Sequence, residues 1–141
     1  LDAKHPDLAR SYNSLGNLYS VKGDNGQAEE FYLKALRIRE EILDAKHPDL
    51  ARSYNSLGNL YSVKGDNGQA KEFCLKALRI CEEVLDAKHP QLADSYFSLG
   101  LVYRKKGDYG QAEEFFLKAL RIREEVLDAK DPDLAESYYI L

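Results

Sequence analysis

The sequence has no long apolar run and no excess of basic charge. None of its apolar stretches approaches the roughly 20 residues that a membrane-spanning helix requires. The 141-residue chain carries a net charge of −4, and no cluster of Lys and Arg stands apart from acidic neighbours. Both features argue against a nucleic acid or an anionic membrane surface as the partner.

Cysteine is scarce, since the chain has only Cys74 and Cys81. On one helix these two residues would lie about 10 Å apart along the axis, beyond the reach of a disulfide. A chain of this length without a feasible internal disulfide points to an intracellular, cytoplasmic location. No signal-peptide pattern is present, but the chain begins with Leu1 rather than Met, so this absence says little about targeting.

One period of 42 residues organises the whole chain. The segment LDAKHPDLARSY opens the first two copies, and close variants of it open the third and fourth. All four prolines hold one place in the period, and all nine glycines hold three places. Repetition at this length indicates stacked supersecondary units. The predicted units span residues 1–42, 43–84 and 85–126, with a partial unit at 127–141.

Each unit is predicted to be a pair of helices joined by a tight turn, with no strand. Pro6 suits the first turn of a helix, where its missing N–H costs nothing. Gly23 is expected just beyond the end of that helix. Asp24 and Gln27 resemble a capping box that opens the second helix. Because apolar residues recur at helical spacing in both segments, the sequence predicts an all-α protein.

Two positions predict details of the packing. Gly16 lies inside the first helix, where it costs about 1 kcal/mol relative to Ala, and it recurs in every full copy. This recurrence predicts a close approach of two helices at which a Cβ would clash. Cys74 stands where the other copies have Tyr32 and Phe116. If Cys74 is buried, the lost ring predicts a cavity that costs about 2–4 kcal/mol.

The pattern within a unit resembles the tetratricopeptide repeat, and the 42-residue period with its HPDLA opening resembles the longer repeats of kinesin light chains and related bacterial and fungal proteins. The resemblance covers the whole chain. It implies an α-solenoid that winds as a right-handed superhelix, whose first helices line a concave groove for peptides or partner helices. It implies no enzymatic activity. The residues that carry it are Tyr12, Leu15, Gly16, Tyr19, Ala28, Tyr32 and Ala35.

The first and third copies differ at ten positions, and the sharp changes fall on one face of the first helix. The polar face of the second helix, which includes Glu30, Lys34 and Arg39 and is expected to face solvent, is identical in both copies. If the changes were harmless sequence drift on solvent-exposed surfaces, they should have altered the polar face of the second helix as well as the face of the first. We therefore favour a binding groove for the varied face over the competing interpretation, a merely solvated surface.

The chemistry of this face suggests a ligand. A ladder of Asn side chains can grip a peptide backbone, Arg side chains can hold acidic groups, and aromatic and aliphatic side chains further along form an apolar subsite. The expected ligand is an extended segment of about eight residues that is acidic at one end. The candidate groove residues are Arg10, Asn13, Asn17, Ser20, Arg52, Asn55, Asn59, Ser62, Asp94, Phe97, Leu101, Arg104, Glu136 and Tyr139.

Metal, cofactor and catalytic sites are not expected. His5, His47 and His89 occur once per copy, just before the proline, and side chains one repeat apart cannot converge on one ion. They are predicted to cap helices or to lie in loops. The sequence has no Ser–His–Asp arrangement, no glycine-rich phosphate loop and no HExxH motif. The sequence therefore predicts a protein that is not an enzyme.

A structural role is the alternative function. The chain begins at what resembles the end of a second helix and stops inside a first helix, and neither end has the polar cap that a solenoid needs. The sequence is therefore predicted to be a fragment of a longer array, whose ends can associate end to end. The alternatives are a structural spacer, a self-assembling array, or the sensor or regulatory arm of a larger protein.

Overall fold

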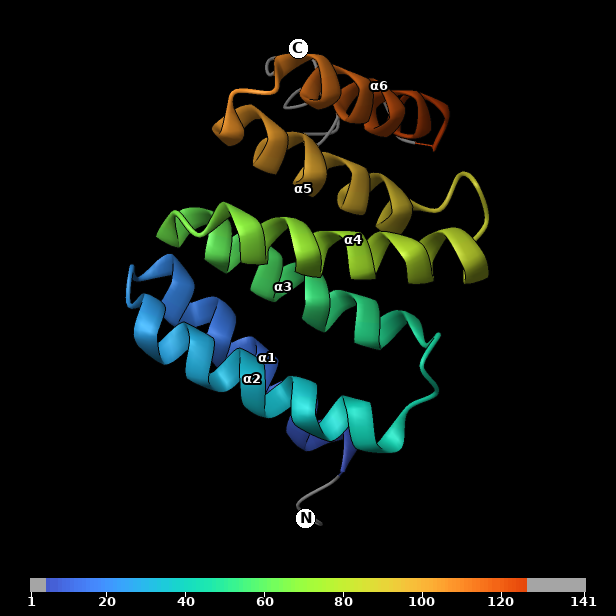
Figure 1. Ribbon diagram of the computed structural model, residues 1–141. Helices are drawn as coiled ribbons and strands as arrows, with labels where there is room; N and C mark the ends of the chain where they lie inside the picture. The colour runs from blue at the N-terminus through green and yellow to red at the C-terminus, as the bar shows by residue number, and fades with distance from the viewer. Residues whose placement is uncertain (1–4, 127–141) are drawn as a thin grey trace.

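The computed structural model describes residues 5–126, and this part of the chain forms six helices and no strand (Figure 1). The helices stack in consecutive pairs, which confirms the predicted all-α repeat fold. The candidate groove residues Glu136 and Tyr139 lie outside the described residues. The helices are α1 (Pro6–Val21), α2 (Asn25–Ile42), α3 (Pro48–Lys64), α4 (Asn67–Val84), α5 (Pro90–Lys106) and α6 (Tyr109–Val126).

A histidine and a proline begin the first helix of every pair. The Nδ1 atom of His5 accepts a hydrogen bond from the backbone N–H of Asp7 at 3.0 Å. His47 and His89 accept the same bond from the residue two positions on. The proline occupies the first turn, as expected from its missing N–H. The prediction that these histidines cap helices is confirmed.

A glycine and an aspartate form the turn inside each pair. Gly23 has a φ angle of +84°, which a residue with a side chain rarely adopts. The Oδ1 atom of Asp24 then accepts a hydrogen bond from the N–H of Gln27 at 3.1 Å and so caps α2. The same arrangement recurs in the second and third copies. The turn predicted from these residues is therefore confirmed.

The glycine inside each first helix lies where the paired second helix leaves no room for a Cβ atom. A Cβ atom on Gly16 would lie 2.5 Å from Cδ1 of Tyr32, which is far inside normal contact. A Cβ on Gly58 would collide with Sγ of Cys74, which is fully buried. The prediction of a close helix–helix approach is confirmed.

The first helices lie on the inner side of a curved stack. Two of the second helices pack against the first helix of the next pair, α2 on α3 and α4 on α5. In addition, α1 contacts α3 and α3 contacts α5, whereas among these six helices α2 does not contact α4 and α4 does not contact α6. Because the layer of first helices is the more closely stacked one, α1, α3 and α5 form the concave face.

The apolar core continues across the boundaries between repeats. Leu57 and Leu60 of α3 are almost fully buried, at 0% and 1% exposure. The equivalent residues of α1, Leu15 and Leu18, are 38% and 53% exposed, because no described helix precedes α1. Burying such a side chain contributes about 1.5–3 kcal/mol, so neighbouring repeats stabilise each other.

The structure corrects the expectation that Arg39 faces solvent. Its side chain is only 8% exposed, and its Nη1 donates hydrogen bonds to Oγ of Ser53 at 2.9 Å and to the carbonyl oxygen of Asp49 at 3.3 Å. Arg123, the equivalent residue of the third copy, is likewise buried. The ends of α2 and α4 are covered because the first helix of the next pair packs against them. Burial lowers the pKa of Arg39, but a guanidinium stays charged at neutral pH.

Candidate functional site

Two adjoining cavities lie on the concave face. The larger, about 610 Å³, is lined mainly by α3 and α5. The smaller, about 290 Å³, is lined mainly by α1 and α3. Ser56 and Asn59 line both cavities, so the two form one continuous depression, which we call the inner groove.

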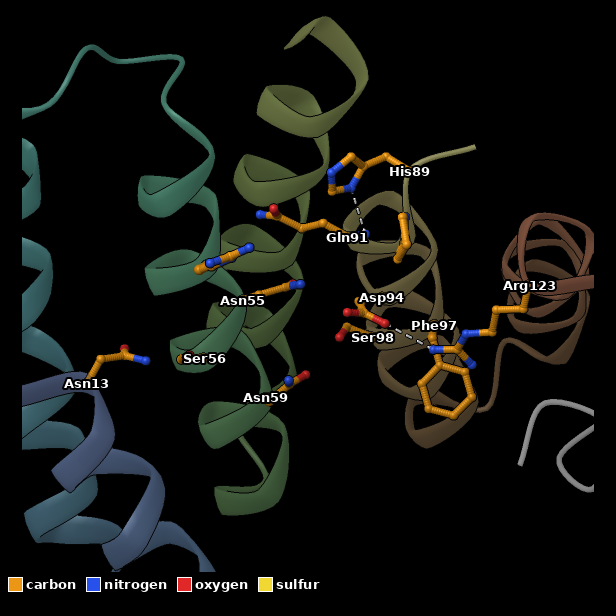
Figure 2. A pocket seen from close by; sticks show the side chains of 12 residues that line it. Asn13, Asn55, Ser56, Asn59, His89, Gln91, Asp94, Phe97, Ser98 and Arg123 are labelled. Atoms are coloured by element: carbon orange, nitrogen blue, oxygen red, sulfur yellow. Dashed lines mark hydrogen bonds and ion pairs between the residues drawn. The ribbon is translucent and has the colours of Figure 1, made fainter. Parts of the chain in front are cut away.

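Figure 2 shows the larger cavity from close by. Asn55 and Asn59 on α3 lie opposite Asp94 and Ser98 on α5, and Arg123 reaches in from α6. The walls are thus built from polar side chains held on rigid helices. Such a surface offers hydrogen bonds to a ligand without the reorganisation that a loop would require.

Most of the described candidate residues line the inner groove. Four others lie outside both cavities: Arg10 and Arg104 are exposed, Leu101 is partly exposed, and Ser62 is buried. The carbonyl oxygen of Ser62 accepts a hydrogen bond from Nζ of Lys105 at 2.9 Å, so Lys105 covers this position. The candidates that line the inner groove are Asn13, Asn17, Ser20, Arg52, Asn55, Asn59, Asp94 and Phe97.

Several groove residues were not predicted from the sequence. Ser56 and Ser98 are identical between copies, so a comparison of the copies gives no signal for them. Gln91 replaces an aspartate and was detectable as a difference, but it precedes the part of the helix where the changes cluster. Arg123 was assigned to the solvent face, because its burial depends on the packing of a neighbouring helix.

Arg123, Asp94 and Phe97 form one wall of the larger cavity. The Nη2 atom of Arg123 lies 3.2 Å from Oδ1 of Asp94, and its guanidinium carbon lies 4.8 Å from the centre of the Phe97 ring. The ring of Phe97 in turn packs against Phe116, with 5.4 Å between the centroids. An arginine that is paired and stacked in this way is held in a fixed position.

The asparagine ladder of the groove is not uniform. In the first copy, Oδ1 of Asn17 accepts a hydrogen bond from the hydroxyl of Tyr32 at 2.6 Å. Nδ2 of Asn55 donates to Oγ of Ser95 at 3.3 Å, and its Oδ1 is buried. Asn59 is exposed, as Asn17 is, but it has no hydrogen-bond partner among the described residues. The amide of Asn59 is therefore the most available of these three.

The sequence profile of the tetratricopeptide repeat family matches this chain over residues 7–73, 49–125 and 98–141. Together these matches cover nearly all of it. The chain belongs to the tetratricopeptide repeat family. Repeats of this family are in general protein–protein interaction scaffolds, and they are typically not enzymes.

Solved structures place this tetratricopeptide array near kinesin light chains. It resembles the nearly identical TPR-like repeats of a kinesin light chain candidate from Podosopora anserina, with 25% identity, a TM-score of 0.89 and coverage of 97% of this chain and 65% of that one. BtubC (BKLC) from P. vanneervenii is 27% identical, with a TM-score of 0.79 and coverage of 87% and 49%. The predicted resemblance to kinesin light chain repeats is confirmed.

The array spans less than two thirds of the length of these two structures. The N-terminal domain of stress-induced protein-1 (STI-1) from C. elegans shares the fold at 23% identity, with a TM-score of 0.63 and coverage of 96% of this chain and 94% of that one. The curated proteins give no match to the sequence.

Both thiols of the tetratricopeptide array are buried and free. Burial raises the pKa of Cys74 to about 12, and it also raises the pKa of Cys81. Because the reactive form of cysteine is the thiolate, neither thiol is activated as a nucleophile at neutral pH. The Sγ atom of Cys81 instead lies 3.6 Å from Oγ of Ser95. This contact is equivalent, one repeat later, to the hydrogen bond from Arg39 to Ser53.

Residues 5–126 contain no group of three or more His, Cys, Asp or Glu side chains arranged to hold a metal ion. Over the same range, none of the helices combines the length and the apolar character that crossing a membrane requires.

Proposed function

We propose that this tetratricopeptide array is a non-enzymatic scaffold that binds an extended peptide, or an extended segment of a partner protein, in the inner groove. The observation that carries the proposal is the continuity of the groove, since Ser56 and Asn59 line both of its cavities. Three first helices at about 9 Å spacing span roughly 27 Å, the length of about eight extended residues.

The groove favours an acidic group at one end of the ligand. Arg52 lines the larger cavity, where its nearest carboxylate is Asp49 of the same helix, at 3.6 Å. The charge of Asp94 in the same cavity is balanced by Arg123. A carboxylate of the ligand can therefore approach Arg52 and form a charge-assisted hydrogen bond.

The smaller cavity favours an apolar side chain at the other end. Val21 and Val63 line it and are 87% and 63% exposed. Leu60 and the ring of Tyr32 also contribute to its wall. Covering this exposed apolar surface on binding contributes about 25 cal/mol per Å². The proposed ligand is thus an extended segment with an acidic end and an apolar end.

Fluorescence anisotropy with labelled octapeptides tests the proposal. The three probes are a peptide with glutamates at one end and leucines at the other, a peptide of lysines and serines, and a peptide of leucines and alanines. We expect the first probe to bind with a dissociation constant in the micromolar range. Arg52→Glu should weaken this binding by about tenfold or more, because it replaces the attraction by repulsion.

Arg37→Glu is the matched control. Arg37 is exposed on α2, outside the concave layer, so the same charge change there should leave the affinity within about twofold of the parent. Binding that is weakened equally by both variants, or no binding of any probe, contradicts the proposal.

A structural role is the second candidate. It is favoured by the exposure of Leu15 and Leu18 on α1, since their counterparts Leu57 and Leu60 are buried by a neighbouring pair. An array that stacks end to end, or that serves as a spacer or regulatory arm in a larger protein, would cover these side chains. Sedimentation velocity separates the candidates: a size that grows with concentration favours self-assembly, and a constant monomer favours the peptide scaffold.

An intracellular, cytoplasmic location remains the prediction, as Cys74 and Cys81 are both free. Free thiols are usual in a reducing compartment.

A further inference from the structure

One pair of positions, on facing helices of each repeat, differs in chemistry between all three copies. In the first copy the pair is Asn17 on α1 and Tyr32 on α2. The Tyr32 hydroxyl donates to Oδ1 of Asn17 at 2.6 Å, and the tyrosine is only 4% exposed. Burial raises the pKa of Tyr32, so the hydroxyl stays protonated and remains a donor. The Asn17 amide is therefore held in one orientation by an internal bond.

In the second copy the same pair is Asn59 and Cys74. Cysteine is shorter than tyrosine and has no hydroxyl, and Cys74 is fully buried beneath Gly58. Asn59 has consequently lost the internal donor, and it has no hydrogen-bond partner among the described residues. It is exposed, and it lines both cavities of the inner groove.

In the third copy both members of the pair are apolar, Leu101 and Phe116. The amide and the hydroxyl are both absent, so this pair leaves no polar group without its hydrogen-bond partner. In the first copy the asparagine amide is hydrogen-bonded to the tyrosine, and in the third copy there is no amide at this position. Only the second of these three copies has an asparagine whose facing residue, Cys74, cannot form that hydrogen bond.

We propose that the residue at the position of Tyr32, Cys74 and Phe116 determines which groove asparagine is open to a ligand. This inference rests on the proposed function, the binding of an extended peptide in the inner groove. Asn59 is then the main contact to the peptide backbone: Nδ2 donates to a peptide carbonyl, and Oδ1 accepts from a peptide N–H. Asn17 contributes less, because the Tyr32 hydroxyl uses one of its acceptor positions and fixes its orientation.

The variants Cys74→Tyr and Cys74→Phe test this inference as a matched pair. Their side chains differ by one hydroxyl, and both residue types already occupy this position in the other copies. The probe is the labelled octapeptide with a glutamate end and a leucine end. We expect Cys74→Tyr to bind about fivefold more weakly than Cys74→Phe, because the new hydroxyl takes the acceptor of Asn59. The difference should vanish when both variants also carry Asn59→Ala.

Removing the hydroxyl from the first copy provides a second test, whose result cannot be mistaken for a folding defect. Tyr32→Phe removes one oxygen atom and keeps the ring, so the helix pair should remain intact. We expect it to release Asn17 and to tighten binding of the same octapeptide by about twofold to fivefold, with no gain when Asn17→Ala is also present.

The outcomes separate this inference from the proposed function. If the parent binds the octapeptide and Cys74→Tyr binds as well as Cys74→Phe, the inference is wrong and the peptide scaffold stands. If the parent binds none of the three probes, both are wrong. As a direct readout, the side-chain amide resonances of Asn59 should shift on addition of the octapeptide, and those of Asn17 should shift less. A larger shift at Asn17 overturns the inference.

Discussion

At the scale of single residues, equivalent positions in successive copies meet different partners. Arg39 of the first copy is buried and bonds Oγ of Ser53 at 2.9 Å. Cys81 takes its place in the second copy, and its thiol lies 3.6 Å from Oγ of Ser95. A hydrogen bond from a charged donor has thus been exchanged for a weak neutral contact, in which either atom can donate, at the same boundary between repeats. The two serines should therefore contribute unequally to stability.

Replacing these serines by alanine measures the difference. Ser53→Ala leaves the buried guanidinium of Arg39 without one acceptor, so we expect the free energy of unfolding to fall by about 1–3 kcal/mol. Ser95→Ala removes a weak thiol contact and a 3.3 Å bond from Asn55, so the loss should be about 1 kcal/mol or less. Urea unfolding of both variants gives the comparison. An equal loss would show that the hydrogen bond from Arg39 contributes no more to stability than the contacts of Ser95.

At the scale of helices, the elements follow from local signals, while their burial depends on what packs beside them. Pro6, Gly23 and Asp24 act within a few residues of themselves, so the starts and the turn of a helix pair are predictable from the sequence. The burial of Arg39 is not, because it arises from contact with the next repeat. The bond that occupies Asn17 was missed for the same reason, since its donor lies on the partner helix.

Two glycines of the first copy give opposite predictions for the same substitution. Gly16→Ala places a Cβ 2.5 Å from the buried ring of Tyr32, and the clash should outweigh the gain in helix propensity of about 1 kcal/mol. We expect a net loss of about 1–2 kcal/mol in the free energy of unfolding. Gly26 lies near the start of α2, and a Cβ there meets nothing closer than 3.9 Å.

Gly26→Ala should therefore raise the free energy of unfolding by about 0.5–1 kcal/mol. Thermal and urea unfolding of the two variants, followed by circular dichroism, provide the measurement. A stabilising effect of Gly16→Ala would mean that the α1 and α2 helices can move apart at little cost.

At the scale of the whole molecule, curvature and stability come from the same contacts. The first helices contact one another along the concave face, and this stacking brings Asn13, Asn55 and Phe97 of three copies to one cavity. The differences between the copies, together with the family resemblance, were enough to predict that face and part of its lining. The predicted apolar subsite lay further along, at candidates such as Phe97 and Leu101. The apolar part that Val21 and Val63 form in the smaller cavity was missed, since the exposure of these two valines depends on how the helices pack.

Adding one more copy of residues 43–84 directly after residue 84 tests how far the repeats depend on each other. The new first helix would bury its own counterparts of Leu57 and Leu60 against the preceding pair, as α3 does. We expect the free energy of unfolding to rise by on the order of 3 kcal/mol, because the insertion adds one interface between repeats and no new free end. The measurement is the urea midpoint at one fixed protein concentration.

The control is the same insertion with Asp in place of the inserted copy's counterpart of Leu60, a position that is fully buried at the boundary between repeats. A charge there should remove the gain in the free energy of unfolding, and it can split the urea unfolding transition in two. If the longer array instead unfolds at the same urea concentration as the parent, each helix pair is stable by itself. The concave face would then be a row of independent units rather than one rigid surface, and an extended ligand would lose affinity because it must order the units that it spans.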